Sequence, residues 1–147
     1  MAGSMHGASV QGRAQGMQVS ARLDGSTSQE SPPTCLAVDI TIDPGLHVYG
    51  HPIPEGFIPL SIDVVAPLTG LRVGTPVFPP PTPHQMEVFD EAFFIYEGDL
   101  SVSIPLTFTA GVDATALEVK VRYQACSEQG CFAPQTVELS LPVRVKR

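Results

Sequence analysis

Two cysteines near the end of the chain carry the chemistry that this sequence offers most directly. Cys126 and Cys131 are separated by the four residues Ser-Glu-Gln-Gly. The residues before Cys126 alternate as in a strand, the four between favour a turn, and a strand pattern resumes near Thr136. This places both cysteines at the neck of a β-hairpin. Directly opposed residues there have Cα atoms about 4.5 or about 5.5 Å apart, within the ~4.4–6.8 Å of a disulfide, so the pair can close.

A disulfide at this position can be a redox centre or a structural bridge. A ring of six residues is worth about 2 kcal/mol in the loop-entropy model, against about 4.7 kcal/mol for a hundred-residue loop. Geometry alone leaves both interpretations open. A zinc site would need four ligands in paired spacings, and the three cysteines supply one close pair. Gly50 and Pro52 exclude the helix that would aim His47 and His51 at one ion, so we expect no metal.

The elements that must position this hairpin are β-strands. Apolar residues recur at every second position in several separate runs, which puts them on one face of each strand. Proline and glycine turns such as Asp43-Pro44-Gly45 separate the runs, and no helix-length pattern lies between them. The predicted strands cover residues 36–42, 46–49, 57–65, 100–108, 117–123 and 137–145. Six or seven such strands predict an all-β fold, an antiparallel two-sheet sandwich.

Composition excludes several classes of protein. Fifteen prolines in 147 residues are about twice the usual share of about 5%, which argues against a helical bundle. The net charge is −7 with only eight Lys and Arg, so the chain lacks the basic face that nucleic-acid binding needs. No window approaches the roughly 20 apolar residues of a membrane span. We therefore expect neither nucleic-acid binding nor membrane insertion of this segment.

The chain divides into a short N-terminal segment and one domain. Residues 1–17 are rich in Gly, Ala, Ser and Gln and lack the apolar stretch of a secretory signal, so we expect disorder there. Residues 18–147 are expected to form the β-sandwich domain. Within it, residues 76–83 (PVFPPPTP) are interpreted as a rigid extended connector rather than a recognition ligand for an aromatic groove.

Three motifs resemble one known family. The run from Tyr123 to Pro134, Tyr-Gln-Ala-Cys-x4-Cys-Phe-x-Pro, resembles the cysteine motif of the N-terminal domain of DsbD thiol:disulfide interchange proteins. The segment DPGLHVYG at residues 43–50 resembles that family's pGxHxY element. The segment FFIYEGDL at residues 93–100, leading into SIPL, resembles its IYxxxL strand. The resemblance covers roughly residues 19–143.

The resemblance implies an immunoglobulin-like β-sandwich and a redox function. Its members are extracytoplasmic, which for this chain implies a periplasmic location. They relay electrons from a membrane-embedded or thioredoxin-like donor to thioredoxin-like partner proteins, without a cofactor. The chemistry is thiolate attack on a disulfide. Carried over, Cys131 attacks and forms the mixed disulfide, and Cys126 resolves it. The alternative is a β-sandwich binding or spacer module with a purely structural disulfide.

The resemblance also names residues around the cysteines. A cap loop shields the family's cysteines; here it corresponds to residues 87–91, with Phe89 as the shielding aromatic and Glu87, Asp90 and Glu91 as an acidic cluster. Phe89 can equally be a core residue of a strand. Tyr49 and His47 correspond to aromatic positions that flank the redox pair, and Tyr123 is the third flanking residue. For His47, packing is favoured over tuning a thiol.

Two departures from the family concern the cysteines themselves. Familiar enterobacterial members place five residues between the paired cysteines, where this chain has four. A change of one residue can shift the hairpin register and move one side chain to the other face. Cys35 has no family counterpart and is expected to be a small buried free thiol at the start of a strand.

Overall fold

Thirteen strands and no helix make up the part of the chain that the computed structural model describes, residues 9–24, 34–53, 56–65, 71–85, 92–108 and 114–144. No helix that could cross a membrane is found among these residues. The strands are β1 (Ser9–Ala14), β2 (Met17–Asp24), β3 (Thr34–Ile42), β4 (Val48–Tyr49), β5 (Ser61–Val65), β6 (Leu71–Val73), β7 (Thr82–Gln85), β8 (Ala92–Tyr96), β9 (Asp99–Phe108), β10 (Ala114–Tyr123), β11 (Cys126–Ser127), β12 (Gly130–Cys131) and β13 (Gln135–Arg144).

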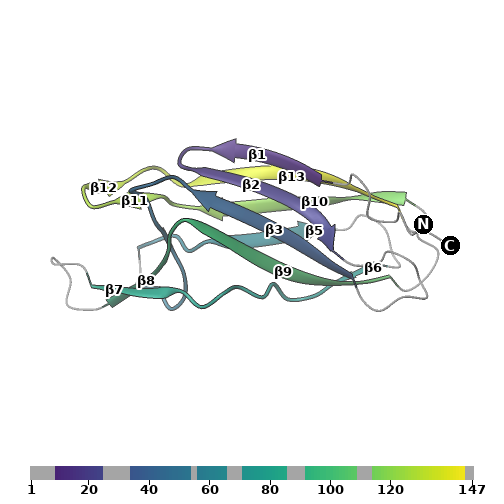
Figure 1. The fold of residues 1–147 in the computed structure, drawn as a ribbon, viewed down its shortest axis with the longest axis horizontal. Coiled ribbons are helices and arrows are strands. Elements are labelled where there is room, and N and C mark those ends of the chain that lie inside the picture. Colours follow the sequence, from purple (N-terminus) through teal and green to yellow (C-terminus); the bar gives the residue numbers. More distant parts are fainter. Residues whose placement is uncertain are drawn as a thin grey trace.

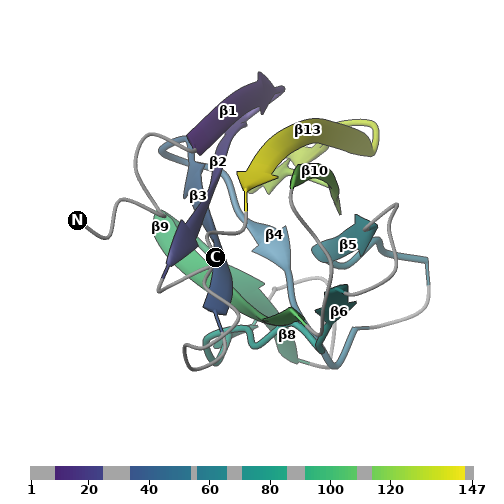
Figure 2. The ribbon, with the colours of Figure 1, turned by 90° about the vertical axis from the view of Figure 1, so that its right-hand side faces the viewer.

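Two antiparallel sheets form the layers of a sandwich. One has the strand order β1-β2-β3-β9-β6 and the other the order β13-β10-β5. Seen end-on, the two sheets face each other (Figure 2). Their inward-facing residues form the main core, in which the largest fully buried aliphatic side chains are Met17, Leu36, Ile40, Ile104, Leu106, Leu117 and Leu141. The all-β sandwich predicted from the alternation is thereby confirmed.

Two small sheets lie at one end of this sandwich. Strands β4, β8 and β7 form one of them, in that order, and β11 and β12 form the other (Figure 1). A bridge between His47, directly before β4, and Cys126 of β11 joins the two. The predicted strand over residues 57–65 is shorter in the structure, where β5 begins only at Ser61. Pro59 has no N–H to donate to a ladder, which favours the later start.

The expected disorder of residues 1–17 is wrong for the described residues of that segment. Residues 9–14 form β1, which pairs with β2. A Cβ atom built on Gly12 would lie 2.9 Å from Cδ2 of Leu139 and 3.1 Å from Cγ1 of Val137. Glycine therefore allows β1 to lie close to β13. The alternating positions Val10, Gly12 and Ala14 are mostly small, so the sequence shows little hydrophobic periodicity there.

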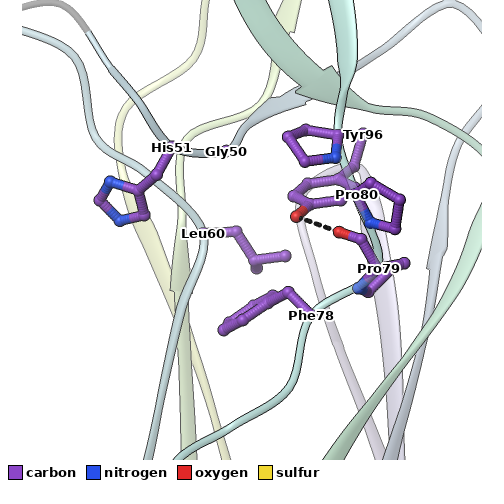
Figure 3. Close-up of a pocket in the computed structure, with 8 residues that line it drawn as sticks. Gly50, His51, Leu60, Phe78, Pro79, Pro80 and Tyr96 are labelled. Carbon is purple, nitrogen blue, oxygen red and sulfur yellow. Dashed lines mark hydrogen bonds between the residues drawn. The ribbon is translucent and has the colours of Figure 1, made fainter.

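The proline-rich segment is a connector, as predicted, and leads from β6 to β7. Val77 pairs with Ser103 of β9 through two backbone hydrogen bonds of 2.7 and 3.1 Å. The hydroxyl of Tyr96 donates a 2.7 Å hydrogen bond to the carbonyl oxygen of Pro79 (Figure 3). A shallow cavity of about 220 Å³ lies between this segment, Leu60 and Tyr96, and neither paired cysteine lines it. These contacts fix the segment to the sandwich.

Candidate functional site

The paired cysteines face each other across the hairpin of β11 and β12. Cys126 is directly opposite Cys131, and Ser127 is opposite Gly130. The two sulfurs form a disulfide, with Cα atoms 3.9 Å apart, and Cys35 is a free thiol. The predicted hairpin and pairing are therefore confirmed. With four residues between the cysteines, both side chains are on the same face, so the shorter spacing leaves the pair able to close.

Backbone hydrogen bonds hold the two cysteines differently. The N–H of Cys126 donates to the carbonyl of His47, and the N–H of His47 donates to the carbonyl of Cys126, each at 2.9 Å. Cys126 is completely buried, whereas Cys131 is exposed. A molecule that approaches this disulfide from solvent therefore meets Cys131 first.

An aromatic cluster surrounds Cys126, separate from the main core. It consists of Cys126 with buried Tyr49, Phe93 and Ile95, and half-buried Ile53 and Phe57 pack against it. The Tyr49 ring lies edge-on to the rings of Phe57 and Phe93, with centroid distances of 5.1 and 5.6 Å. Strands β4 and β8, which pair directly, supply most of these side chains. The cluster therefore shields Cys126 from solvent.

His47 is a packing residue beside the cysteines. Its side chain is only 4% exposed, and Nε2 has no hydrogen-bond partner among the described residues. The ring lies 5.4 Å from the ring of Tyr49 and 5.7 Å from that of His84. Burial and the neighbouring His84 lower the pKa of His47, while Glu97 and Glu128 act in the opposite direction. The imidazole is therefore neutral at pH 7 and places no positive charge beside the disulfide.

One side-chain contact joins the cysteine hairpin to β7. Nε2 of His84, in β7, lies 3.9 Å from a carboxylate oxygen of Glu128, in the turn between the cysteines. Both β7 and β8 lie at the same end of the molecule as β11 and β12 (Figure 1). The predicted cap residues Glu87, Phe89, Asp90 and Glu91 fall between β7 and β8 and lie outside the described residues. Strands β7 and β8, which precede and follow these residues, both lie beside the cysteines, β7 through His84 and β8 through Phe93 and Ile95.

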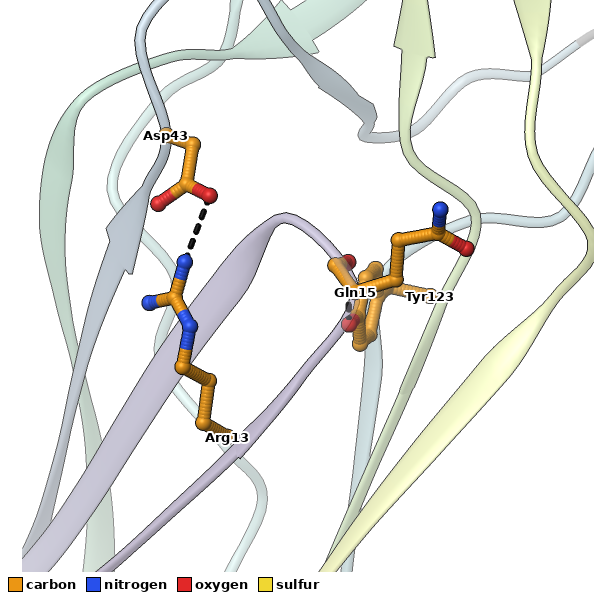
Figure 4. A network of polar contacts seen from close by, with 4 residues as sticks. All are labelled: Arg13, Gln15, Asp43 and Tyr123. Carbon is orange, nitrogen blue, oxygen red and sulfur yellow. Dashed lines mark hydrogen bonds and ion pairs between the residues drawn. The ribbon is translucent and has the colours of Figure 1, made fainter.

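Tyr123, the third predicted flanking residue, anchors the strand that leads to Cys126. Its ring lies in the main core, not in the aromatic cluster. Its hydroxyl donates a 2.7 Å hydrogen bond to the carbonyl of Gln15, beside the ion pair of Arg13 and Asp43 (Figure 4). Burial raises the pKa of Tyr123 to about 12. The hydroxyl therefore stays protonated at pH 7 and remains a donor to Gln15.

Three residues of the site were not predicted as site residues: Phe57 and His84 lie outside the three motifs, and Phe93 lies within one without being singled out. Phe57, Phe93 and His84 lie around Cys126 and His47 only because strands distant in sequence meet there. The apolar run at residues 93–96 was the available signal for Phe93. No group of three or more His, Cys, Asp or Glu side chains in the described part of the chain is arranged to hold a metal ion.

Comparison with known families identifies the family to which this chain belongs. Residues 17–142 match the family described as thiol:disulfide interchange protein DsbD, N-terminal. The chain belongs to the DsbD N-terminal domain family. This confirms the resemblance seen in the three motifs, and the sandwich is of the immunoglobulin-like type. No curated protein sequence matches the chain at a significant level.

Solved structures of DsbD N-terminal domains and of a related protein share the fold. The N-terminal domain of Neisseria meningitidis DsbD in its reduced form is 19% identical, with a TM-score of 0.54 and 84% of each chain covered. The same domain in complex with the PilB N-terminal domain is 17% identical, with a TM-score of 0.53 and 80% of each chain covered. The N-terminal periplasmic domain of Proteus mirabilis ScsB is 16% identical, with a TM-score of 0.59; the match covers 96% of this chain and about half, 51%, of ScsB's.

Proposed function

We propose that this DsbD N-terminal domain relays electrons by thiol–disulfide exchange through a reversible Cys126–Cys131 disulfide. The proposal rests on the difference in solvent exposure between the two cysteines. Cys131 is exposed, and Cys126 is buried and fixed to His47. Exchange needs one sulfur that a partner can reach and a second that stays close enough to displace that partner. The family's description as thiol:disulfide interchange proteins supports the same assignment.

In the proposed reaction the thiolate of reduced Cys131 attacks one sulfur of a partner's disulfide. The partner's S–S bond breaks, a mixed disulfide with Cys131 forms, and the partner's second sulfur leaves as a thiolate that takes up a proton. The thiolate of Cys126 then attacks the sulfur of Cys131. This closes Cys126–Cys131 and releases the partner's other sulfur as a thiol. Two electrons and two protons pass from the domain to the partner, and no cofactor is needed.

A structural disulfide is the competing function, and the local contacts argue against it. Strand β11 is already held by the two backbone hydrogen bonds between Cys126 and His47. A further bridge across a six-residue ring adds about 2 kcal/mol in the loop-entropy model, the small end of what disulfides contribute. A spacer module would gain little from a bond placed at an exposed hairpin.

The relatives indicate the partners and the compartment. A Neisseria meningitidis DsbD N-terminal domain forms a complex with the PilB N-terminal domain, and the ScsB domain is periplasmic. By analogy, we assign this domain to an extracytoplasmic compartment, the periplasm. Its electron acceptors are thioredoxin-like proteins, and its donor is a membrane-embedded or thioredoxin-like protein. An oxidising compartment suits a disulfide that closes once per turnover.

The reduction potential of the pair tests the proposal. We expect a value above about −300 mV, because structural disulfides in secreted proteins have potentials below about −300 mV. Equilibration of the domain with dithiothreitol or glutathione buffers, followed by alkylation and mass spectrometry of the Cys126–Cys131 peptide, gives this value. Replacing Cys35 by alanine removes the third thiol from the measurement. A potential well below −300 mV would favour the structural bridge.

We further propose that residues 87–91 form a cap and that Phe89 covers the disulfide. Support comes from the position of β7 and β8 beside the cysteine hairpin and from the contact of His84 with Glu128. An aromatic ring on sulfur contributes about 0.3–1.5 kcal/mol, so a docking partner can displace it. A Phe89→Ala variant should then be reduced by dithiothreitol faster than the wild type, by up to roughly tenfold. Phe78→Ala, a change in the connector, is the control. Equal rates for wild type and Phe89→Ala would assign Phe89 to the core.

A further inference from the structure

We propose that a thioredoxin-like partner docks by pairing an extended backbone segment with the open edge of β12 at Cys131. This inference rests on the proposed function and names the surface that receives the partner. Among the described strands, β12 pairs with β11 alone. The opposite edge of β12 includes the backbone of Cys131, the residue proposed to attack the partner. Pairing at a free edge is a general way for proteins to bind extended peptide segments.

The direction of the backbone groups follows from the hydrogen bonds around the hairpin. The N–H of Phe132 donates to the carbonyl of Ala125 at 2.9 Å, and the carbonyl of Phe132 accepts from Nε2 of Gln124 at 3.3 Å. Both backbone groups of Phe132 thus point toward β11. In an antiparallel ladder the polar groups of successive residues point to alternate sides. The N–H and C=O of Cys131 therefore point to the open edge, as does the N–H of Ala133, whose carbonyl accepts a 3.5 Å hydrogen bond from Nε2 of Gln135.

The composition of this edge also favours docking. Edge strands are usually protected by charged side chains, a bulge or a covering element. Residues 130–134, Gly-Cys-Phe-Ala-Pro, are all exposed and carry no charge. Phe132, 39% exposed, is one of three large hydrophobic residues exposed among the described residues; the other two, Val65 and Val77, lie on β5 and in the connector. An uncharged edge beside a reactive cysteine suits a transient protein partner.

The covalent intermediate brings the partner's backbone to this edge. A disulfide joins residues whose Cα atoms are about 4.4–6.8 Å apart, which includes the roughly 5.5 Å of a hydrogen-bonded pair in neighbouring strands. A cysteine bonded to Cys131 therefore lies at strand-pairing distance from β12. Pro134 has no N–H and ends the edge after Ala133. The paired segment is short, so release can follow once the mixed disulfide is resolved.

Amide hydrogen exchange in the trapped complex tests the pairing. The chain carries Cys126→Ser and Cys35→Ala, so Cys131 is its sole cysteine. The probe is a thioredoxin that keeps only its exposed active-site cysteine, activated as the disulfide with thionitrobenzoate. Thiolate attack by Cys131 displaces thionitrobenzoate and joins the two proteins. The reference is the same variant with Cys131 blocked by a methylthio group, which has the same disulfide but no partner backbone.

We expect the amides of Cys131 and Ala133 to exchange about tenfold more slowly in the complex than in the methylthio reference, because edge pairing adds backbone hydrogen bonds. The exposed turn amide of Glu128 is the control and should not change. Unchanged exchange at Cys131 and Ala133, or equal slowing at Glu128, would overturn edge pairing. Slow exchange in the reference itself would also overturn it, since the chain's own residues or a second copy would then occupy the edge.

Phe132→Ser gives an independent readout. We expect it to slow formation of the mixed disulfide with the thioredoxin probe about tenfold, the usual effect of removing an interface anchor. Its reaction with free thionitrobenzoate disulfide should be unchanged. Val77→Ser, which removes an exposed hydrophobic residue in the connector, should react at the parent rate. Equal rates for both variants would contradict the docking surface. Failure of the parent domain to exchange with any disulfide would instead contradict the proposed function.

Discussion

Replacing Cys131 by serine is expected to abolish electron transfer to a thioredoxin-like partner, whereas Cys126→Ser should accumulate a covalent complex with it. Cys131 is exposed and Cys126 is buried, so only Cys131 can meet a partner's disulfide from solvent. Removing the attacking thiolate stops the reaction before any bond forms. Removing Cys126 stops it one step later, because no second thiol is left to displace the partner from Cys131.

Both variants are incubated in reduced form with an oxidised thioredoxin-like protein. The products are separated without reductant and weighed by mass spectrometry. Transfer by Cys131→Ser should fall to the level without domain, and the mass of the sum of both proteins should appear with Cys126→Ser. Cys35→Ser is the matched control and should transfer as the wild type does. A covalent complex formed by Cys131→Ser would reverse the two roles.

Replacing Tyr49 by alanine should destabilise the domain by about 3–5 kcal/mol, the usual effect of removing a large buried aromatic side chain. Tyr49 is 1% exposed and contacts the rings of Phe57 and Phe93 beside Cys126. The cavity left behind would also open a path to the buried sulfur. We therefore expect faster reduction of the disulfide by dithiothreitol at denaturant concentrations where the variant is still folded.

Conservative variants separate the ring of Tyr49 from its hydroxyl. The hydroxyl is buried and forms no hydrogen bond with any described residue, so Tyr49→Phe should leave stability unchanged or raise it. In contrast, Tyr123→Phe should cost about 0.5–1.5 kcal/mol, because its hydroxyl donates to the carbonyl of Gln15. Urea unfolding of the four proteins, wild type included, measures these differences. A loss above 1 kcal/mol for Tyr49→Phe would show that its hydroxyl has a bonding partner.

Much of the fold was predictable because β-sandwich cores leave a period-two pattern. Strands β3, β9, β10 and β13 each bury alternate apolar residues, and each was predicted from that alternation. The cysteine hairpin was predictable for a different reason, since its turn and both cysteines lie within six residues. Strand β1 was missed because Gly12 and Ala14 replace the large apolar residues that reveal a strand. Its pairing depends on close approach to β13, which only the assembled sandwich provides.

The sequence by itself determined which two cysteines pair, the class of fold and the family. Those properties depend on local turns, on alternation and on short motifs, all of which are written in consecutive residues. Only the tertiary structure decided that Cys126 is buried against Tyr49, Phe93 and Phe57 while Cys131 is exposed. It also decided that His47 holds Cys126 through its backbone and that the edge of β12 is open among the described strands. The physical reason is that burial and hydrogen-bond direction are set by strands that are distant in sequence and meet only when the sheets pack.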